Sequence, residues 1–138
     1  MMRISADLLA QIVAHAQEDP TIECCGVVAV EPGSPARAVG VYPITNMHAS
    51  ALKFEMDPDE LLKRYKAILA DGMEIGAIYH SHVRSPPYPS QTDVNFARLW
   101  PGSEWIIVGL ANGQAPEVRS YLIQEGEVKE MRIPETVG

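Results

Sequence analysis

The chain has few cysteines, few positive charges and no long apolar run. Its two cysteines, Cys24 and Cys25, are sequence neighbours, and a disulfide between neighbours is strained. This argues against the disulfide framework that small secreted domains use. No apolar run approaches the ~20 residues that a membrane-spanning helix needs, and the first residues lack the apolar core of a secretion signal. We therefore expect a cytoplasmic protein that does not enter a membrane.

Lysine and arginine together number 11 against 18 aspartates and glutamates, giving a formal net charge of −7. Nucleic-acid phosphates attract the opposite balance of charge, so we expect no nucleic-acid partner. Hydrophobic residues make up 46% of the 138 residues and charged residues 21%, which is typical of a globular protein. A chain of this length predicts one domain over residues 1–138.

Apolar spacing and helix-capping residues predict the secondary structure. Helices are expected over residues 5–18, from an N-cap at Ser5, over residues 57–70, and in a short segment over residues 92–99. Apolar runs predict strands over residues 23–30, 38–44, 74–82, 105–110, 118–124 and 128–133, with a short extended piece at 52–54. This order favours an α/β layered domain with a mixed β-sheet flanked by helices.

The most informative segment is the end of the third predicted strand and the loop that follows it. His80 and His82 are two residues apart, so on a strand their side chains point to the same face. A proline-rich loop then leads to Asp93. Two imidazoles and one carboxylate are enough protein ligands for a divalent metal that keeps a position open for water.

Ser90 has two interpretations at this stage. Ser90-x-x-Asp93 resembles a helix capping box, in which a serine and an acid three residues later satisfy backbone N–H groups. Thr92 could cap the same helix, which would leave Ser90 free for chemistry. Spacing alone does not choose between a structural and a catalytic Ser90.

His80-x-His82, seven intervening residues, Ser90, two more residues and Asp93 together resemble the signature of the JAMM (MPN-plus) metalloproteases. In that family an upstream glutamate before an apolar strand completes the site. Glu23, followed by Cys24-Cys25-Gly26 and two valines, matches that glutamate. The likeness extends over nearly the whole chain, including the loop from Asn46 to Ser50. It implies the layered, cytidine-deaminase-like fold of that family.

The resemblance also implies a role for each matching residue. His80, His82 and Asp93 would bind one Zn²⁺, Glu23 would act as general base and then general acid, and Ser90 would donate a hydrogen bond to the oxyanion. Glu18 and Asp19, which precede Pro20, and Glu74, six residues before His80, are less well placed to act as the base.

Cys24 and Cys25 are interpreted as small buried hydrophobic residues, although cysteine can ligate zinc. His15 and His48 are interpreted as packing or surface residues.

The substrate is also inferred from the resemblance. JAMM enzymes hydrolyse amide bonds after the C-terminal tails of ubiquitin-like proteins, and this compact chain looks most like small bacterial members. Those enzymes release cysteine from a ubiquitin-like sulfur-carrier protein, a step in cysteine synthesis. Three alternatives stay open. The first is an isopeptidase that removes a ubiquitin-like modifier from lysine, the second a non-haem iron enzyme with the same ligands, and the third a non-catalytic scaffold of the same fold.

Overall fold

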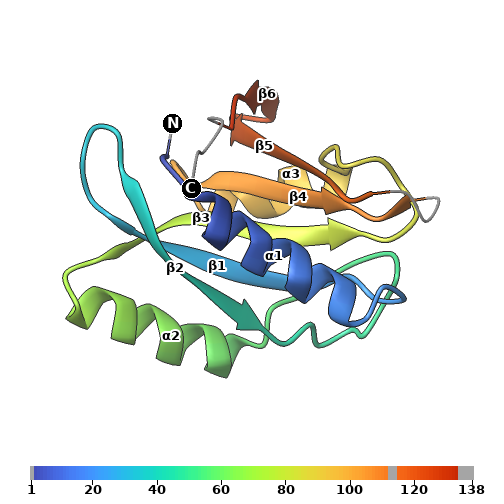
Figure 1. Cartoon of the computed structure of the whole chain (residues 1–138), viewed down its shortest axis with the longest axis horizontal. Helices are drawn as coiled ribbons and strands as arrows, with labels where there is room; N and C mark the ends of the chain where they lie inside the picture. The colour runs from blue at the N-terminus through green and yellow to red at the C-terminus, as the bar shows by residue number, and fades with distance from the viewer. Residues whose placement is uncertain (1, 112–114, 134–138) are drawn as a thin grey trace.

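The computed structural model describes residues 2–111 and 115–133 (Figure 1). Within them, helices and strands follow one another in the order that the sequence predicts. In chain order they are α1 (Ala6–Glu18), β1 (Cys25–Glu31), β2 (Arg37–Ile44), α2 (Pro58–Ala70), β3 (Glu74–His82), α3 (Gln91–Phe96), the short 3-10 helix η1 (Ala97–Leu99), β4 (Glu104–Gly109), β5 (Glu117–Gln124) and β6 (Glu127–Met131).

These strands form one sheet with the spatial order β2-β1-β3-β4-β5-β6. β3 and β4 are parallel, and each other neighbouring pair is antiparallel. A parallel pair needs a crossover connection, which the segment containing α3 and η1 supplies. The predicted mixed sheet is therefore confirmed.

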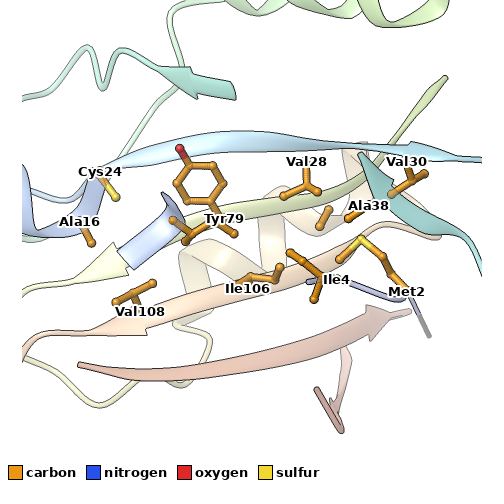
Figure 2. Packing of buried hydrophobic residues seen from close by; sticks show 12 residues of the cluster. Met2, Ile4, Ala16, Cys24, Val28, Val30, Ala38, Tyr79, Ile106 and Val108 are labelled. Atoms are coloured by element: carbon orange, nitrogen blue, oxygen red, sulfur yellow. The ribbon is translucent and has the colours of Figure 1, made fainter. Parts of the chain in front are cut away.

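Helices cover both faces of the sheet (Figure 1). On one face α1 packs over a cluster in which Val28, Tyr79 and Ile106 are buried (Figure 2). On the other face α2, α3 and η1 cover a second cluster, which contains Val27 and Ile78. Adjacent residues of β1 and β3 thus enter opposite cores, as the alternation of a strand requires. β1 is therefore buried on both faces.

The two long helices begin where the sequence predicts. The Ser5 hydroxyl accepts a hydrogen bond from the Leu8 N–H at 3.2 Å and caps α1. The Asp57 carboxylate caps α2, whose first residue is Pro58. No helix within the described residues is long and apolar enough to cross a membrane.

Two details differ from the predictions. The first strand begins at Cys25 rather than Glu23, and residues 52–54 do not form a strand. α2 packs against β2 and β3, and its apolar side chains are unevenly buried. Ile68 is 3% exposed, whereas Leu62 and Leu69 remain 50% and 46% exposed.

Gly26 lies directly opposite Tyr79 in the pairing of β1 with β3. The tyrosine ring folds over the glycine, and a Cβ atom at position 26 would overlap that ring. This placement lets the Tyr79 hydroxyl bond to Nδ1 of His15 on α1 at 2.7 Å. His15 is thus the packing residue that the sequence predicts, and the contact joins the sheet to α1.

We expect Gly26→Ala to lower the free energy of unfolding by about 1–3 kcal/mol, because the added methyl group displaces a fully buried ring. Urea denaturation at fixed metal content measures the change. Gly33→Ala is the matched control: it lies in an exposed turn where the nearest atom, the Pro35 carbonyl oxygen, is 3.2 Å from the new Cβ. Equal stability of the two variants would refute the packing role of Gly26.

Candidate metal centre

The two predicted histidines lie at the end of β3, on the face of the sheet that α3 covers. His80 is fully buried and His82 is 4% exposed. Their Nε2 atoms are 3.0 Å apart, and their ring centroids are separated by 4.9 Å. The same-face placement predicted from strand alternation is confirmed, and both rings present Nε2 to one point.

Asp93 joins the histidines from α3. Its Oδ2 atom lies 3.1 Å from Nε2 of His80 and 3.3 Å from Nε2 of His82. Ligand atoms bound about 2.0–2.1 Å from a tetrahedral metal lie about 3.3–3.4 Å from one another. The triangle formed by the two nitrogens and the oxygen is close to that size. These three side chains therefore fit a divalent metal ion.

A hydrogen bond fixes which nitrogen of His82 is offered to a metal, whereas the buried Nδ1 of His80 has no hydrogen-bond partner among the described residues. Nδ1 of His82 lies 2.8 Å from the Pro86 carbonyl oxygen, so this nitrogen carries the proton and Nε2 keeps its lone pair. The ring of His80 is stacked on Phe54, with centroids 4.5 Å apart, and meets the edge of Trp105. These contacts restrict rotation of both imidazole rings.

The proline-rich loop that provides the Pro86 carbonyl is itself anchored to the sheet. The Tyr121 hydroxyl of β5 donates a hydrogen bond to the Pro87 carbonyl oxygen. Gly109, at the end of β4, leaves room for the Pro87 ring: a Cβ there would lie 2.8 Å from Pro87 Cδ. Tyr88 is 58% exposed and stands edge-on to Tyr121. Sequence analysis missed Tyr121, because nothing local marks a contact across 34 positions.

Ser90 is the N-cap of α3, and the capping box is present. Its hydroxyl accepts a hydrogen bond from the Asp93 N–H at 3.1 Å, and Oδ2 of Asp93 accepts one from the Ser90 N–H at 2.9 Å. The suggestion that Thr92 caps this helix is therefore wrong, since the helix already begins at Gln91. Because Ser90 Oγ acts here as an acceptor, its own proton can still be donated to a substrate.

Glu23 lies two residues before the start of β1, and its carboxylate points toward the same site. It is 5% exposed, and one of its carboxylate oxygens lies within 4.8 Å of ring nitrogens of His80 and His82. Glu23, His80 and His82 thus form a group that could hold a metal ion, and Asp93 lies 3.1 and 3.3 Å from the same two imidazoles. Both carboxylates are therefore within reach of an ion bound by the histidines.

The pKa values of the Glu23 and Asp93 carboxyl groups are shifted in opposite directions. Burial raises the pKa of Glu23 to about 7; His82 opposes this rise and Asp93 adds to it. Burial would also raise the pKa of Asp93, but its close approach to the His80 and His82 rings and the hydrogen bond from the Ser90 N–H hold that pKa well below its usual value. Asp93 is therefore ionised, as a ligand must be, and Glu23 can exchange a proton near neutral pH.

The two cysteines beside Glu23 are both buried and unpaired with each other. Burial raises the pKa of the Cys24 thiol to about 11, so it is not a thiolate at neutral pH. Cys25 lies opposite His80 in the pairing of β1 with β3, and its thiol donates to the Ile44 carbonyl oxygen of β2 at 3.4 Å. Their interpretation as buried hydrophobic residues agrees with these positions. His48 is exposed and pairs with Glu55.

A family model for prokaryotic homologues of the JAB domain matches residues 5–124. The chain belongs to this family. The match spans both Glu23 and the segment from His80 to Asp93, so the resemblance inferred from the sequence is confirmed.

Named relatives and a solved structure support the assignment. The chain is 39% identical over 130 residues to the CysO-cysteine peptidase of Mycobacterium tuberculosis, covering 92% of this chain and 86% of that protein. It is 38% identical over 112 residues to the desampylase of Haloferax volcanii, covering 77% and 78%. The solution structure of a Desulfitobacterium hafniense protein superposes with a TM-score of 0.84 at 30% identity, covering 97% and 92%.

We expect His82→Ala to weaken metal binding by more than the ~10–100-fold that loss of an outer-shell partner causes, because it removes a ligand atom. Metal analysis after dialysis against a competing chelator measures the retained fraction. His48→Ala, which removes an exposed histidine, is the matched control and should keep full occupancy. Full occupancy in the His82 variant as well would remove His82 from the ligand set.

Proposed function

We propose that this protein is a zinc-dependent peptidase that hydrolyses the amide bond at the C-terminal tail of a ubiquitin-like sulfur-carrier protein and releases cysteine from a carrier–cysteine adduct. The observation that carries this proposal is the convergence of Nε2 of His80, Nε2 of His82 and Oδ2 of Asp93 within 3.3 Å of one another. The buried Glu23 carboxylate beside them supplies the proton-transfer group that amide hydrolysis needs.

In this proposal His80, His82 and Asp93 hold the zinc ion. When bound, zinc would lower the pKa of its water to about 7 and polarise the scissile carbonyl. Glu23 takes up the proton that the attacking water loses and holds it on a carboxylate oxygen. It then gives that proton to the nitrogen of the departing amine, which balances the reaction.

Ser90 completes the proposed chemistry. Its Oγ is fixed by the bond it accepts from the Asp93 N–H, so its proton can be directed at the developing oxyanion. The capping role therefore supports the catalytic role: one hydroxyl stabilises the helix start and keeps its own donor aimed into the site.

Two features support a carrier-protein substrate. Both histidines are almost fully buried, so a substrate must reach the metal with a narrow, extended segment such as a Gly-Gly-type tail. Of the two named enzymes described above, the one that matches more of this chain is the CysO-cysteine peptidase. Its similarity extends over 92% of this chain, which includes each residue of the proposed site.

The desampylase relative favours a second candidate activity, removal of a ubiquitin-like modifier from a lysine side chain. The bond broken is again an amide to a carrier tail, and the departing group is the amine of a larger protein. The residues of the site act in the same way in both reactions. The two activities therefore differ only in what the protein accepts on the leaving-group side.

Substrates of both kinds separate the candidates. The zinc-loaded protein is incubated with a thiocarboxylate-derived carrier–cysteine adduct and, in parallel, with the same carrier joined to a lysine ε-amine. We expect mass spectrometry to show loss of cysteine from the first substrate, and expect chelation to prevent it. Cleavage of the lysine conjugate alone would favour the isopeptidase. Stoichiometric iron without zinc after anaerobic purification would contradict the zinc assignment and favour the non-haem iron alternative.

We expect Glu23→Gln to lower kcat by about 10²–10⁴-fold, because it removes the proton acceptor. Zinc content should stay at the wild-type level, since the ligand atoms remain. Glu18→Gln, an exposed residue at the end of α1, is the matched control and should leave kcat unchanged. Substantial activity in the Glu23 variant would mean that another group is the base.

For Ser90→Ala we expect kcat to fall about 10²–10³-fold, the usual effect of removing one oxyanion donor. Ser85→Ala, in the exposed part of the same loop, controls for changes in the loop itself. The oxyanion role would be wrong if both serine variants retained wild-type kcat at equal zinc content.

A further inference from the structure

Glu23 is not held by the sheet that carries the two histidines. β1 begins two residues later, at Cys25, and the contacts with β3 nearest to Glu23 are made by Cys24. The Cys24 N–H donates to Ser81 Oγ at 2.9 Å, and the Cys24 carbonyl accepts from the Ser81 N–H at 3.1 Å. Cys24 thus ties the chain next to Glu23 to β3, but the backbone groups of Glu23 itself bond to another part of the chain.

The loop between β2 and α2 binds both backbone groups of Glu23. Its N–H donates to the Ser50 carbonyl oxygen at 2.7 Å. Its carbonyl oxygen accepts from Nδ2 of Asn46 at 3.0 Å. By contrast, no hydrogen bond reaches the Glu23 carboxylate from another residue in the described part of the chain. The backbone anchors on either side of its Cα therefore help to set where the carboxylate lies.

Asn46 also closes the loop on itself. Besides the Glu23 carbonyl, Nδ2 donates to the Lys53 carbonyl oxygen at 3.1 Å. Its Oδ1 accepts from the N–H groups of His48 and Glu55, at 3.0 and 3.1 Å. The side chain is 9% exposed and uses two donors and two acceptor sites, the full capacity of a primary amide. A buried group bonded in this way holds its partners in a single arrangement.

We propose that Asn46 is a positioning residue for Glu23: it fixes the loop over residues 46–55 and, through it, the distance of the Glu23 carboxylate from the histidine pair. The inference rests on the catalytic role proposed above for Glu23. Within the described residues Asn46 makes no hydrogen bond to His80, His82 or Asp93. Phe54 of the same loop stacks on His80, so the zinc content of each variant separates an effect on the metal from one on Glu23. A displacement of about 1 Å at a reacting group can lower a rate by about 10²-fold.

The kinetic test uses Asn46→Ala, which removes both donors, and Asn46→Asp, which keeps the shape but turns an oxygen toward two carbonyl oxygens. With the carrier–cysteine adduct we expect both variants to lower kcat by about 10- to 100-fold while KM and zinc content stay within about twofold. Asn95→Asp, the same change at an exposed position on α3, should keep wild-type kcat.

Two further variants separate positioning from general loss of stability. Ile68→Ala removes a buried side chain of α2 that lies outside the metal centre, and should lower the melting temperature without lowering kcat below that temperature. In a Glu23→Gln background, Asn46→Ala should lower the residual rate no further, because the residue through which it acts is already disabled. A full additional loss in that background would overturn the proposal.

Amide hydrogen exchange followed by NMR tests the same inference without a substrate. In the zinc-loaded wild-type protein we expect the Glu23 backbone N–H and the Asn46 side-chain NH₂ to be protected. In Asn46→Ala the Glu23 N–H should exchange at least ~10-fold faster, while the Ser81 N–H keeps its protection. Unchanged Glu23 protection, or wild-type kcat in both Asn46 variants, would overturn the inference. If wild-type protein cleaves neither carrier substrate, the proposed function fails, and exchange at Glu23 alone decides whether Asn46 positions it.

Discussion

The candidate metal centre depends on which face of the sheet each residue of β3 points to. Along β3, His80 and His82 face the helices α2 and α3, whereas Tyr79 and Ser81 face α1 or the segment before β1. A shift of one residue in the pairing of β3 would exchange these sets and place the imidazoles in the wrong core. Gly26 helps to exclude that shift, because it lies opposite Tyr79 and alone leaves room for the ring. The register that builds the core therefore also builds the site.

The sheet carries His80 and His82. The other residues of the site lie on a short helix and on loops that hydrogen bonds hold in place. Asp93 and Ser90 enter through the proline-rich loop, which Tyr121 and Gly109 hold against β4 and β5. Glu23 enters from the segment before β1, which the loop over residues 46–55 holds. In both cases a side chain bonds to a backbone carbonyl far away in sequence. A rigid sheet with loops tied to it in this way can hold functional side chains within about 0.5 Å of a productive geometry.

Much of the fold and of the site follows from the sequence, for physical reasons. Alternation places His80 and His82 on one face, and Ser5 and Asp57 mark helix starts through their own hydrogen bonds. Local patterns could not locate the contacts of Tyr121 and Asn46, which depend on segments brought together by folding. Periodicity likewise places Leu62 and Leu69 on one stripe of α2, but it does not show how much of that stripe the sheet covers. The sequence did not decide between a structural and a catalytic role for Ser90, because a serine at this position can both cap a helix and donate a hydrogen bond to a substrate.

X-ray absorption at the zinc edge tests the central assignment most directly. If His80, His82 and Asp93 hold the ion, the zinc-loaded protein should show only nitrogen and oxygen neighbours at about 2.0–2.2 Å, with the outer-shell scattering of two imidazole rings. Replacing either histidine by alanine should remove one ring from that pattern. A sulfur neighbour at about 2.3 Å would place Cys24 or Cys25 on the metal and contradict the assignment.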